Sequence, residues 1–473
     1  MTSSRPQAKQ LEFDFTAASS EAGGEEPGNS TGEPQRGESC RAVMEKPALD
    51  PVLEALMEQI VDRHSLDRAW RKVRRNGGAP GPDGITLKEF PKHIQTLWPR
   101  LRQELLEGTY QPAAARRKSI PKPDGSERHL GIPNVQDRVI QQAILQVLTP
   151  IFDPSFSESS FGFRPKRSAH GAAKQVQRII RQKHRYCVDM DLSKFFDRVQ
   201  HDVLMHRVAR KVHDKRLLRL IGSYLRAGVM VDGLLQPSHE GTMQGGPLSP
   251  FLANILLDDF DKELEKRGLP FVRYADDFLI FTKTEAASQR VFRSVEDYLT
   301  RKLKLVVNQQ KSRTLKTDGV EFLGFQFQGW GGQIRVAPKN LKKFKEKTRD
   351  ITSRSRGIPM RDRLQELRQY FRGWGGYFAL VPIKTAFTGL DAWTRRRVRM
   401  CYWKQWRLPR TRIRQLKAMG LSSDLARTHG TSRKGPWRLS KSKGLSIAMP
   451  TKWLTDQGLV SLESIWNKLA PLR

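Results

Sequence analysis

The chain has 473 residues, of which 38% are hydrophobic, and it carries a formal net charge of +35 with a pI near 10.4. This length predicts two to four domains, and the apolar content, with 22 Phe and 10 Trp, excludes a chain that is disordered throughout. The three cysteines, Cys40, Cys187 and Cys401, are too scattered for a disulfide framework or a zinc knuckle. No apolar run has the length of a membrane span or a signal-peptide core, so we expect a cytoplasmic protein without a membrane partner.

The positive charge is distributed unevenly along the chain. Residues 1–50 hold 5 basic and 9 acidic residues, a net of −4, so the other 423 residues carry +39. A field this basic indicates a polyanionic partner, most often nucleic acid, with a general solubility charge as the alternative. The first 50 residues are rich in Gly, Ser, Glu and Pro, and they predict a disordered acidic tail.

Amphipathic helices are predicted to follow as an N-terminal extension over residues 51–115. Apolar residues recur at helical spacing after Pro51, and a loop rich in glycine and proline over residues 77–84 ends that pattern. A further helix is expected in the stretch "FPKHIQTLWPRLRQELLEG", ending at Gly108.

A two-stranded hairpin is predicted next, turning at Pro123-Asp124-Gly125. Two interpretations remain open for its basic residues: a solvated sheet edge protected by charge, or a clamp for a polyphosphate. These residues are Arg116, Arg117, Lys118, Lys122 and Arg128.

Acidic residues end two of the predicted strands farther along the chain. In "RYCVDMDLSKFF", Asp189 and Asp191 are two apart, so strand alternation places both on one face. In "RYADDFLIF", the pair Asp276-Asp277 lies at the junction of two short strands, which predicts a hairpin with carboxylates at its tip. If the strand before Asp191 pairs alongside, the carboxylates converge and require divalent metal, and oxygen ligands of this kind suit Mg²⁺ and phosphoryl transfer.

A second acidic pair, Asp258-Asp259, gives an internal comparison. It lies in an amphipathic pattern with Ser249 as the expected N-cap, Pro250 in the first turn and Gly268 at the end. We expect this pair to occupy a solvated helix face without metal.

The sequence resembles bacterial group II intron-encoded reverse transcriptases over roughly residues 60 to 420. Tyr274-Ala275-Asp276-Asp277 looks like the tetrapeptide of that family, and further blocks agree in order and spacing. These blocks are "GAPGPDGIT", "IPKPDGSERHLGIP", "DRVIQQAI", "SFGFRPKRSAHGA", "VDMDLSKFFDRVQH", "QGGPLSPFLANILLDDFD", "LVVNQQKS" and "VEFLGF".

The resemblance implies an α+β right-hand polymerase fold, with fingers and palm over residues 116–335. It implies that Asp191, Asp276 and Asp277 form a catalytic triad that ligates two Mg²⁺ ions, with Asp277 as the weaker ligand. Asp189 is left as a strand-end acid that tunes the site.

The resemblance also implies a binding site for dNTP substrates. Lys122 and Arg128 match positions that contact the triphosphate, and Phe196 matches an aromatic wall that excludes a 2′-hydroxyl. Gln244 matches a position lining the nucleotide pocket, and Gly245-Gly246 would allow close approach of the template or base pair. For Phe196 a core position, and for Gln244 a simple turn position, remain the alternatives.

The C-terminal third is helical in pattern, aromatic and strongly basic. Residues 391–450 hold 16 Lys/Arg against 2 Asp, and seven of the ten tryptophans lie between Trp374 and Trp466. Such a composition suits an RNA-binding surface, although most of these tryptophans are expected in a core. Residues 336–420 resemble the helical thumb, domain X, of group II intron maturases.

Residues 421–473 are expected to form a short basic tail that packs on the thumb or contacts DNA or RNA. His429 is the only histidine after His239, and Cys401 the only cysteine there, so we expect no His-Asn-His endonuclease domain. If the intron that encodes such a protein is mobile, we expect it to use nicks or replication-fork primers made by other enzymes.

The implied partners are structured RNA, namely group II intron RNA, an RNA template/DNA primer duplex and target DNA. An RNA-directed DNA polymerase that also assists splicing is the leading interpretation. A splicing-only maturase and a domesticated reverse transcriptase in phage defence or DNA repair are the alternatives, and a surrounding group II ribozyme would count against the last. The sequence does not give the oligomeric state.

Overall fold

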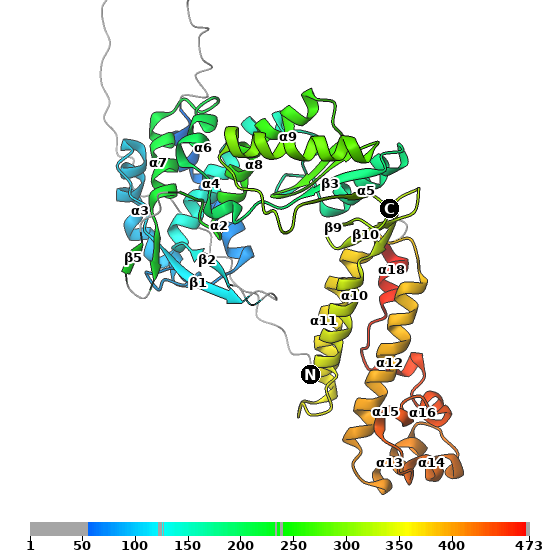
Figure 1. Cartoon of the computed structure of the whole chain (residues 1–473). Helices are drawn as coiled ribbons and strands as arrows, with labels where there is room; N and C mark the ends of the chain where they lie inside the picture. Colours follow the sequence, from blue (N-terminus) through cyan, green and yellow to red (C-terminus); the bar gives the residue numbers. More distant parts are fainter. Residues whose placement is uncertain (1–54, 122–124, 126, 232–233, 237–239, 470–473) are drawn as a thin grey trace, which may run out of the picture. The chain divides into compact units, whose positions relative to one another are not determined.

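The computed structural model describes residues 55–121, 125, 127–231, 234–236 and 240–469 (Figure 1). The expected acidic tail of residues 1–50 lies outside them. The chain divides into two compact units. The first unit is Met1–Ser168, Val188–Thr282 and Ala286–Thr314, and the second is Ala169–Cys187, Lys283–Glu285 and Leu315–Arg473.

Helices make up most of the first unit. α2 shows how the sequence specifies them: Asp62 caps its first turn by accepting a 3.0 Å hydrogen bond from Ser65 N, and Leu66, Trp70 and Val73 are buried along one face. The helices are α1 (Leu56–Val61), α2 (Arg63–Asn76), α3 (Phe90–Glu107), α4 (Val135–Phe152), α6 (His201–Val208), α7 (Lys215–Arg226), α8 (Ser249–Lys266) and α9 (Glu285–Leu303), with short 3-10 turns η2 (Asp153–Ser155) and η3 (Phe195–Asp197).

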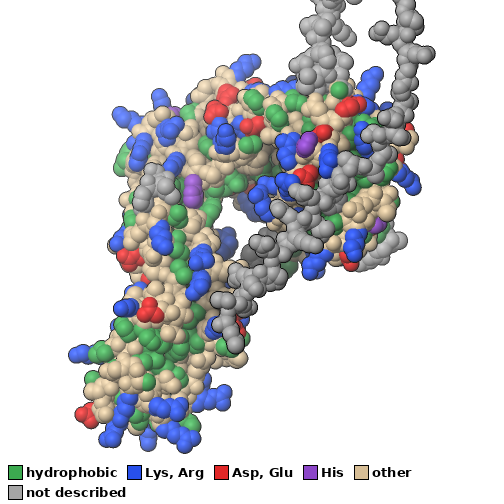
Figure 2. All heavy atoms as spheres, turned by 180° about the vertical axis from the view of Figure 1, so that it is seen from behind, with side chains coloured by type: hydrophobic (Ala, Val, Ile, Leu, Met, Phe, Trp, Pro, Cys, Tyr) green, Lys and Arg blue, Asp and Glu red, His purple; other side chains and the backbone are tan. Residues whose placement is uncertain are grey.

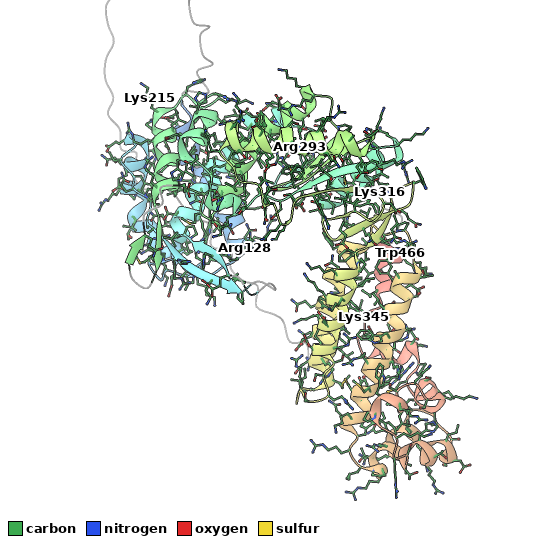
Figure 3. All side chains as sticks on the ribbon, viewed as in Figure 1. Arg128, Lys215, Arg293, Lys316, Lys345 and Trp466 are labelled. Atoms are coloured by element: carbon green, nitrogen blue, oxygen red, sulfur yellow. The ribbon has the colours of Figure 1, made fainter. Side chains whose placement is uncertain are left out.

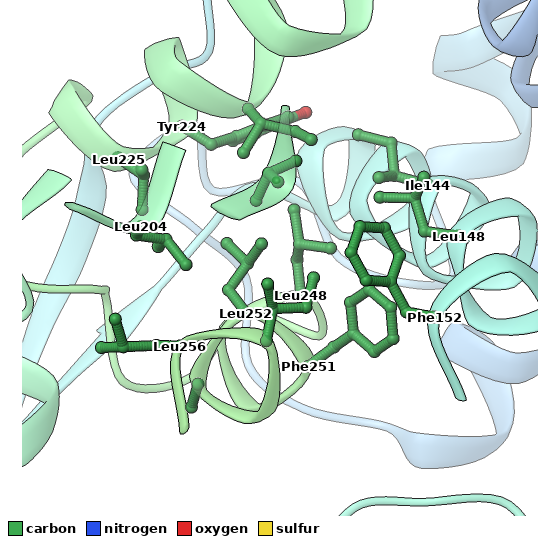
Figure 4. Close-up of a cluster of buried hydrophobic side chains, with 14 of the residues drawn as sticks. Ile144, Leu148, Phe152, Leu204, Tyr224, Leu225, Leu248, Phe251, Leu252 and Leu256 are labelled. Carbon is green, nitrogen blue, oxygen red and sulfur yellow. The ribbon is translucent and has the colours of Figure 1, made fainter. Parts of the chain in front are cut away.

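The core of this unit lies among α4, α6, α7 and α8 (Figure 4). Phe152 of α4 and Phe251 of α8 meet edge to face, with ring centroids 5.8 Å apart. Leu204, Leu225 and Leu252 lie in the same cluster. This packing holds α8 in place, and α8 carries Asn254 and Asp261, which brace the site described below.

The described residues form two four-stranded sheets and one three-stranded sheet. One sheet has the order β2-β1-β4-β5 and another the order β6-β7-β3-β8, while β11-β10-β9 lies in the second unit. The strands are β1 (Ala115–Pro121), β2 (Glu127–Ile132), β3 (Tyr186–Met190), β4 (Val229–Val231), β5 (Leu234–Gln236), β6 (Phe271–Tyr274), β7 (Asp277–Thr282), β8 (Arg313–Lys316), β9 (Glu321–Phe322), β10 (Phe325–Gln328) and β11 (Gln333–Val336).

The predicted basic hairpin is the antiparallel pair of β1 and β2, in which Pro121 pairs with Glu127. Most of its predicted turn lies outside the described residues. The helix expected to end at Gly108 is α3, and Gly108 closes it in the left-handed conformation with φ of 72°.

The second unit is built mainly of helices. Its aromatic core forms where Phe344 of α10 meets Phe371 and Trp374 of α11, with ring centroids 5.2 Å and 4.5 Å away. The helices are α5 (Ala169–Arg181), α10 (Pro338–Ile351), α11 (Met360–Phe378), α12 (Thr385–Gln405), α13 (Pro409–Ala418), α14 (Ser423–Gly430), α15 (Pro436–Leu439), α16 (Lys443–Ala448), α17 (Thr451–Asp456) and α18 (Leu462–Leu469).

Among the tryptophans from Trp374 to Trp466, Trp403 and Trp406 are buried and the other five are half-buried, so the core expectation holds only in part. Trp403 is fully buried, and Arg396 covers the ring of half-buried Trp437, its guanidinium carbon 3.6 Å from the centroid. The last segment of the chain returns to α11 and α12: Asp391 accepts a 2.9 Å hydrogen bond from Leu462 N at the start of α18. The domain boundaries expected from the sequence remain a prediction.

Lys and Arg side chains are spread over the visible face of both units, and Asp and Glu are sparse there (Figure 2). Throughout the described ranges, each helix is either too short or too polar to cross a membrane.

Candidate active site

The acidic tetrapeptide forms a tight hairpin, as its flanking strands predict. β6 and β7 pair antiparallel, with Tyr274 opposite Asp277, so Ala275 and Asp276 make the turn. Ala275 has a φ of 60°, a left-handed conformation that residues other than glycine seldom adopt. The hairpin tip therefore requires support from its surroundings.

A buried arginine supplies that support. Arg273 is fully buried in β6, and its Nε donates a 2.7 Å hydrogen bond to Oδ1 of Asp261, which is also fully buried. Its Nη1 donates to Asn254 Oδ1 at 2.9 Å and to the carbonyl oxygen of Ala275 at 3.0 Å. Since charge-assisted hydrogen bonds are strong where water is excluded, this ion pair fixes the turn that carries Asp276.

The strand before Asp191 is β3, and it lies next to β7 in the sheet, as expected if the carboxylates of Asp191, Asp276 and Asp277 converge. Asp191 follows the end of β3, and its Oδ2 accepts a 3.1 Å hydrogen bond from Asn308 Nδ2. Lys311 Nζ lies 3.9 Å from the same oxygen, and Ser312 Oγ accepts from Asp191 N at 3.1 Å. We did not assign roles to Asn308 and Lys311 from the sequence, although both lie in the "LVVNQQKS" block.

The carboxylates share one electrostatic environment. Asp277 is exposed at the hairpin tip, and the protein around its carboxyl, followed by the charges of Asp189, Asp276 and Asp191, raises its pKa to about 7. Burial raises the pKa of Asp189 to about 6, and the charge of Asp191 adds to the effect against that of Arg313. Burial and then Asp191 also raise the pKa of Asp276, while Arg128 and Arg273 oppose the shift.

No three carboxylate, imidazole or thiol side chains stand close enough to hold a metal ion in the part of the chain that the structure describes. The donor chemistry nevertheless fits a hard divalent cation, because carboxylates that raise one another's pKa are stabilised by a positive charge between them. The expectation that Asp191, Asp276 and Asp277 hold such a cation remains a prediction.

The predicted nucleotide-binding residues come together beside the hairpin of β1 and β2. Arg128 Nε donates a 2.8 Å hydrogen bond to Oε1 of Gln244. Gln244 and Phe196 line one pocket of about 240 Å³, together with Arg117 and His129. Phe196 also packs against the core, and its ring centroid lies 5.2 Å from that of Phe195, so the wall and core positions are compatible. Lys122 lies outside the described residues.

The glycine pair after Gln244 has close neighbours within the chain itself. A Cβ at Gly245 would lie 2.2 Å from the carbonyl oxygen of Gly131, and one at Gly246 would lie 2.4 Å from Gln141 Oε1. The Gln244 carbonyl also accepts a 2.7 Å hydrogen bond from Gly131 N. A φ of 132° and the backbone of β2 are therefore sufficient to require glycine at Gly245, whereas a side chain at Gly246 would require the Gln141 side chain to shift.

The comparison pair Asp258-Asp259 corrects one expectation. Asp258 is buried rather than solvated, and burial raises its pKa while Lys262, with which it forms an ion pair, opposes the shift. Asp259 bonds to Arg207 at 2.9 Å and Arg210 at 2.7 Å. The helical pattern alone does not show that packed neighbours cover this face of the helix.

The helix boundaries of α8 also differ by one position. Ser249 is its first residue, not its N-cap, and its Oγ donates a 2.6 Å hydrogen bond to the carbonyl of Met243. Pro250 lies in the first turn and Gly268 follows the helix end with φ of 64°, as predicted.

Paired carboxylates on a hairpin tip, next to a strand followed directly by a third, are the arrangement expected of a polymerase palm. Residues 120–327 match the family described as reverse transcriptase (RNA-dependent DNA polymerase), and residues 341–420 match the group II intron, maturase-specific domain. This chain belongs to the reverse transcriptase family and also carries a maturase-specific domain. The α+β right-hand polymerase fold with a helical thumb, expected from the sequence, is confirmed.

Curated relatives agree with this membership. Protein YkfC of Escherichia coli is 34% identical over 320 residues, which cover 59% of this chain and 84% of that protein. The group II intron-encoded protein LtrA of Lactococcus lactis is 36% identical over 192 residues, 40% of this chain. That alignment spans 31% of LtrA, so the chain covers about a third of this relative's length.

Solved structures align more loosely. Apo telomerase from Candida tropicalis aligns over 76% of this chain and 71% of its own, with 13% identity and a TM-score of 0.42. A partial Cas6-RT-Cas1–Cas2 complex aligns over 52% of this chain and 42% of its own, with 26% identity and a TM-score of 0.34. The identification of the fold therefore stands on the family match.

Proposed function

We propose that this protein is an RNA-directed DNA polymerase that copies an RNA template into DNA and also binds group II intron RNA to assist its splicing. One observation carries the polymerase assignment: Asp191 and the hairpin of Asp276 and Asp277 belong to neighbouring strands, and Arg128 acts electrostatically on Asp276. The carboxylates thus lie close to the pair formed by Arg128 and Gln244, where a triphosphate would approach.

In nucleotidyl transfer, the carboxylates and the pair of Arg128 and Gln244 would have different roles. Two Mg²⁺ ions, when bound, supply the activation of a primer 3′-hydroxyl and the neutralisation of the triphosphate. Asp191 and Asp276 would hold these ions, with Asp277 in support. Arg128 would contact the phosphates of the incoming dNTP, since its fork of N–H donors matches phosphate oxygens, while Gln244 orients the guanidinium.

Phe196 is proposed to select the sugar. Its side chain lines the pocket that Gln244 also lines. The edge-to-face contact with the buried ring of Phe195 fixes the position of the Phe196 ring in that pocket. A rigid aromatic wall leaves no room for a 2′-hydroxyl, so ribonucleotides would be rejected by steric exclusion.

The maturase role is supported by the family match over residues 341–420 and by the basic surface of the second unit. A pocket of about 350 Å³ in that unit is lined by Arg354, Arg356, Lys404 and Arg407 among others. Arg363 holds its wall by donating to the carbonyl of Ser353 at 3.0 Å. Clustered guanidinium groups on a fixed frame suit the phosphates of folded RNA.

Primer extension tests the polymerase assignment. The wild-type protein, with RNA template, DNA primer, dNTPs and Mg²⁺, is expected to extend the primer. Asp276→Asn is expected to lose at least about 10³-fold in rate, because a metal ligand contributes several kcal/mol to the transition state. Asp297→Asn, which removes a carboxylate that pairs with Arg301 on the surface, is the matched control and should extend normally.

Splicing is measured separately on a group II intron precursor. Asp276→Asn should assist splicing as well as wild type, whereas Lys404→Glu with Arg407→Glu should bind RNA weakly and fail to assist. Equal primer extension by wild type and Asp276→Asn would refute the catalytic assignment. Tight RNA binding without any extension by the wild type would leave a splicing-only maturase.

A further inference from the structure

Trp330 differs from every other tryptophan in the chain. All ten lie among the described residues, and Trp330 alone is exposed, at 78% of its surface. Tryptophan has a large apolar area that normally packs inside or at an interface. A side chain of this kind left open to solvent therefore indicates a surface for a partner.

The turn that carries this ring is well fixed. Trp330 lies between β10 and β11, where Gly332 N donates to the Gly329 carbonyl at 3.1 Å. Gly329 N in turn donates a 2.7 Å hydrogen bond to Asp318 Oδ1. The ring is thus presented by a braced turn, not by a frayed loop end.

One face of the ring is supported by an arginine. The guanidinium of Arg185 lies over Trp330, 4.3 Å from the ring centroid, and its Nη1 donates a 3.0 Å hydrogen bond to the Trp330 carbonyl. A cation on one face holds the indole in a fixed orientation. With Arg185 in place, 78% of the Trp330 side chain is still exposed, so the ring has area left for a second flat group.

A basic hollow adjoins the ring. It measures about 390 Å³ and lies wholly within the second unit, and Lys316, at the end of β8, is marked in Figure 3. Lys283 and Lys316 are exposed, and within the described ranges neither forms an ion pair. The lining residues are Arg185, Tyr186, Lys283, Lys316, Thr317, Asp318, Gly329 and Trp330.

The charge of the hollow favours an anion. Three cations, Arg185, Lys283 and Lys316, face one carboxylate, Asp318, and one oxygen of Asp318 is already bonded to Gly329 N. An aromatic platform beside free lysines is the combination that binds unpaired nucleotides, because bases stack on the ring while phosphates meet the cations.

We propose that this hollow binds one or two unpaired nucleotides of a polynucleotide, with a base on Trp330 and phosphates on Lys283 and Lys316. It is a second nucleic-acid site, separate from the polymerase site. None of the residues that line the hollow is among those proposed for the polymerase site. The proposal does not depend on catalysis.

Binding is measured with the full chain in the presence of a saturating, unlabelled primer–template duplex that occupies the polymerase site. A fluorescent single-stranded 12-mer is then titrated, as RNA in one arm and DNA in the other, and a hairpin duplex serves as a third probe. Trp330→Ala is expected to weaken binding of the single strand roughly 5- to 100-fold, and Trp330→Phe to restore part of it.

The lysines give a second, independent readout. Lys283→Gln with Lys316→Gln should reduce the slope of log affinity against log salt by about one to two. Arg335→Gln is the matched control, since Arg335 is an exposed cation on β11 that does not line the hollow. Primer extension and the melting temperature should be unchanged in all these variants.

Equal affinity of wild type and Trp330→Ala for the single-stranded 12-mer would overturn the proposal. So would tighter binding of the hairpin duplex than of either single-stranded 12-mer. Loss of primer extension by the wild type would count against the proposed polymerase, and it would leave this result interpretable.

Discussion

Arg128 Nε and Gln244 Oε1 are joined by a 2.8 Å hydrogen bond across 116 positions of the chain. The contact links β2 to the loop before α8, and it places a guanidinium whose charge also acts on Asp276. The basic hairpin of β1 and β2 is therefore more than a solvated sheet edge, because the charge of its Arg128 acts on the carboxylate of Asp276.

This contact predicts that the two residues act together on the dNTP. Arg128→Ala and Gln244→Ala should each raise the KM for dNTP several-fold, and the double variant should be less impaired than the product of the two effects. The coupling should be about 1 kcal/mol, since one exposed hydrogen bond to a charged group is lost. Steady-state primer extension gives the values, with Lys215→Ala as the basic control in the same unit.

Phe196→Ala is expected to admit ribonucleotides, because the wall beside Gln244 would be removed. The ratio of kcat/KM for dNTP over rNTP should fall at least about tenfold, which corresponds to about 1.4 kcal/mol of lost discrimination. Phe195→Leu is the matched control: it should lower stability without changing this ratio, since Phe195 is buried. An unchanged ratio in Phe196→Ala would return Phe196 to a core role alone.

Asp277 predicts a pH-dependent stability of the metal-free protein. Its pKa is raised to about 7 in the folded chain, so the folded state holds this proton more tightly than the unfolded state. The stabilising effect is full below the ordinary pKa near 3.8 and is lost as pH rises toward 7. Asp277→Asn removes the penalty, so its melting temperature should exceed that of wild type by a few degrees at pH 8.

The difference in melting temperature between Asp277→Asn and wild type should shrink at pH 5 and on addition of Mg²⁺. A proton on Asp277, or a cation beside it, relieves the repulsion among the carboxylates. Differential scanning calorimetry with and without EDTA measures it. A variant that melts below wild type at pH 8 would show that Asp277 stabilises the apo fold by some other contact.

The buried ion pair under the hairpin predicts a loss of both stability and rate. Arg273→Leu leaves Asp261 buried without its partner, so the free energy of unfolding should fall by about 3–5 kcal/mol. Urea unfolding followed by circular dichroism measures this change. Arg273→Leu combined with Asp261→Leu should regain much of that stability, yet polymerisation should stay slow, since the bond to the Ala275 carbonyl is still missing.

Full recovery of primer extension in the double variant would show that Arg273 is needed only for folding. Arg267→Leu is the control, because Arg267 pairs with Glu263 on the surface and should cost less than about 1 kcal/mol.

The sequence by itself determined the local elements around the candidate site and the types of side chain that they carry. Strand alternation places Asp189 and Asp191 on one face, and the apolar runs around Asp276-Asp277 can form only a short hairpin. Gly108 and Gly268 ended their helices as expected. These features follow from the nearest few residues, whose conformations are restricted by sterics and side-chain pattern.

Tertiary structure decided which distant residues meet and which are covered. The helical pattern predicted a solvated Asp258, but neighbouring elements bury it, and the pair Gly245-Gly246 packs against the chain's own β2 and α4. The support of Asp191 by Asn308, the bond between Arg128 and Gln244 and the exposure of Trp330 were equally beyond local pattern. Burial and long-range contact depend on how elements pack, and packing is a property of the whole folded unit, not of any one segment.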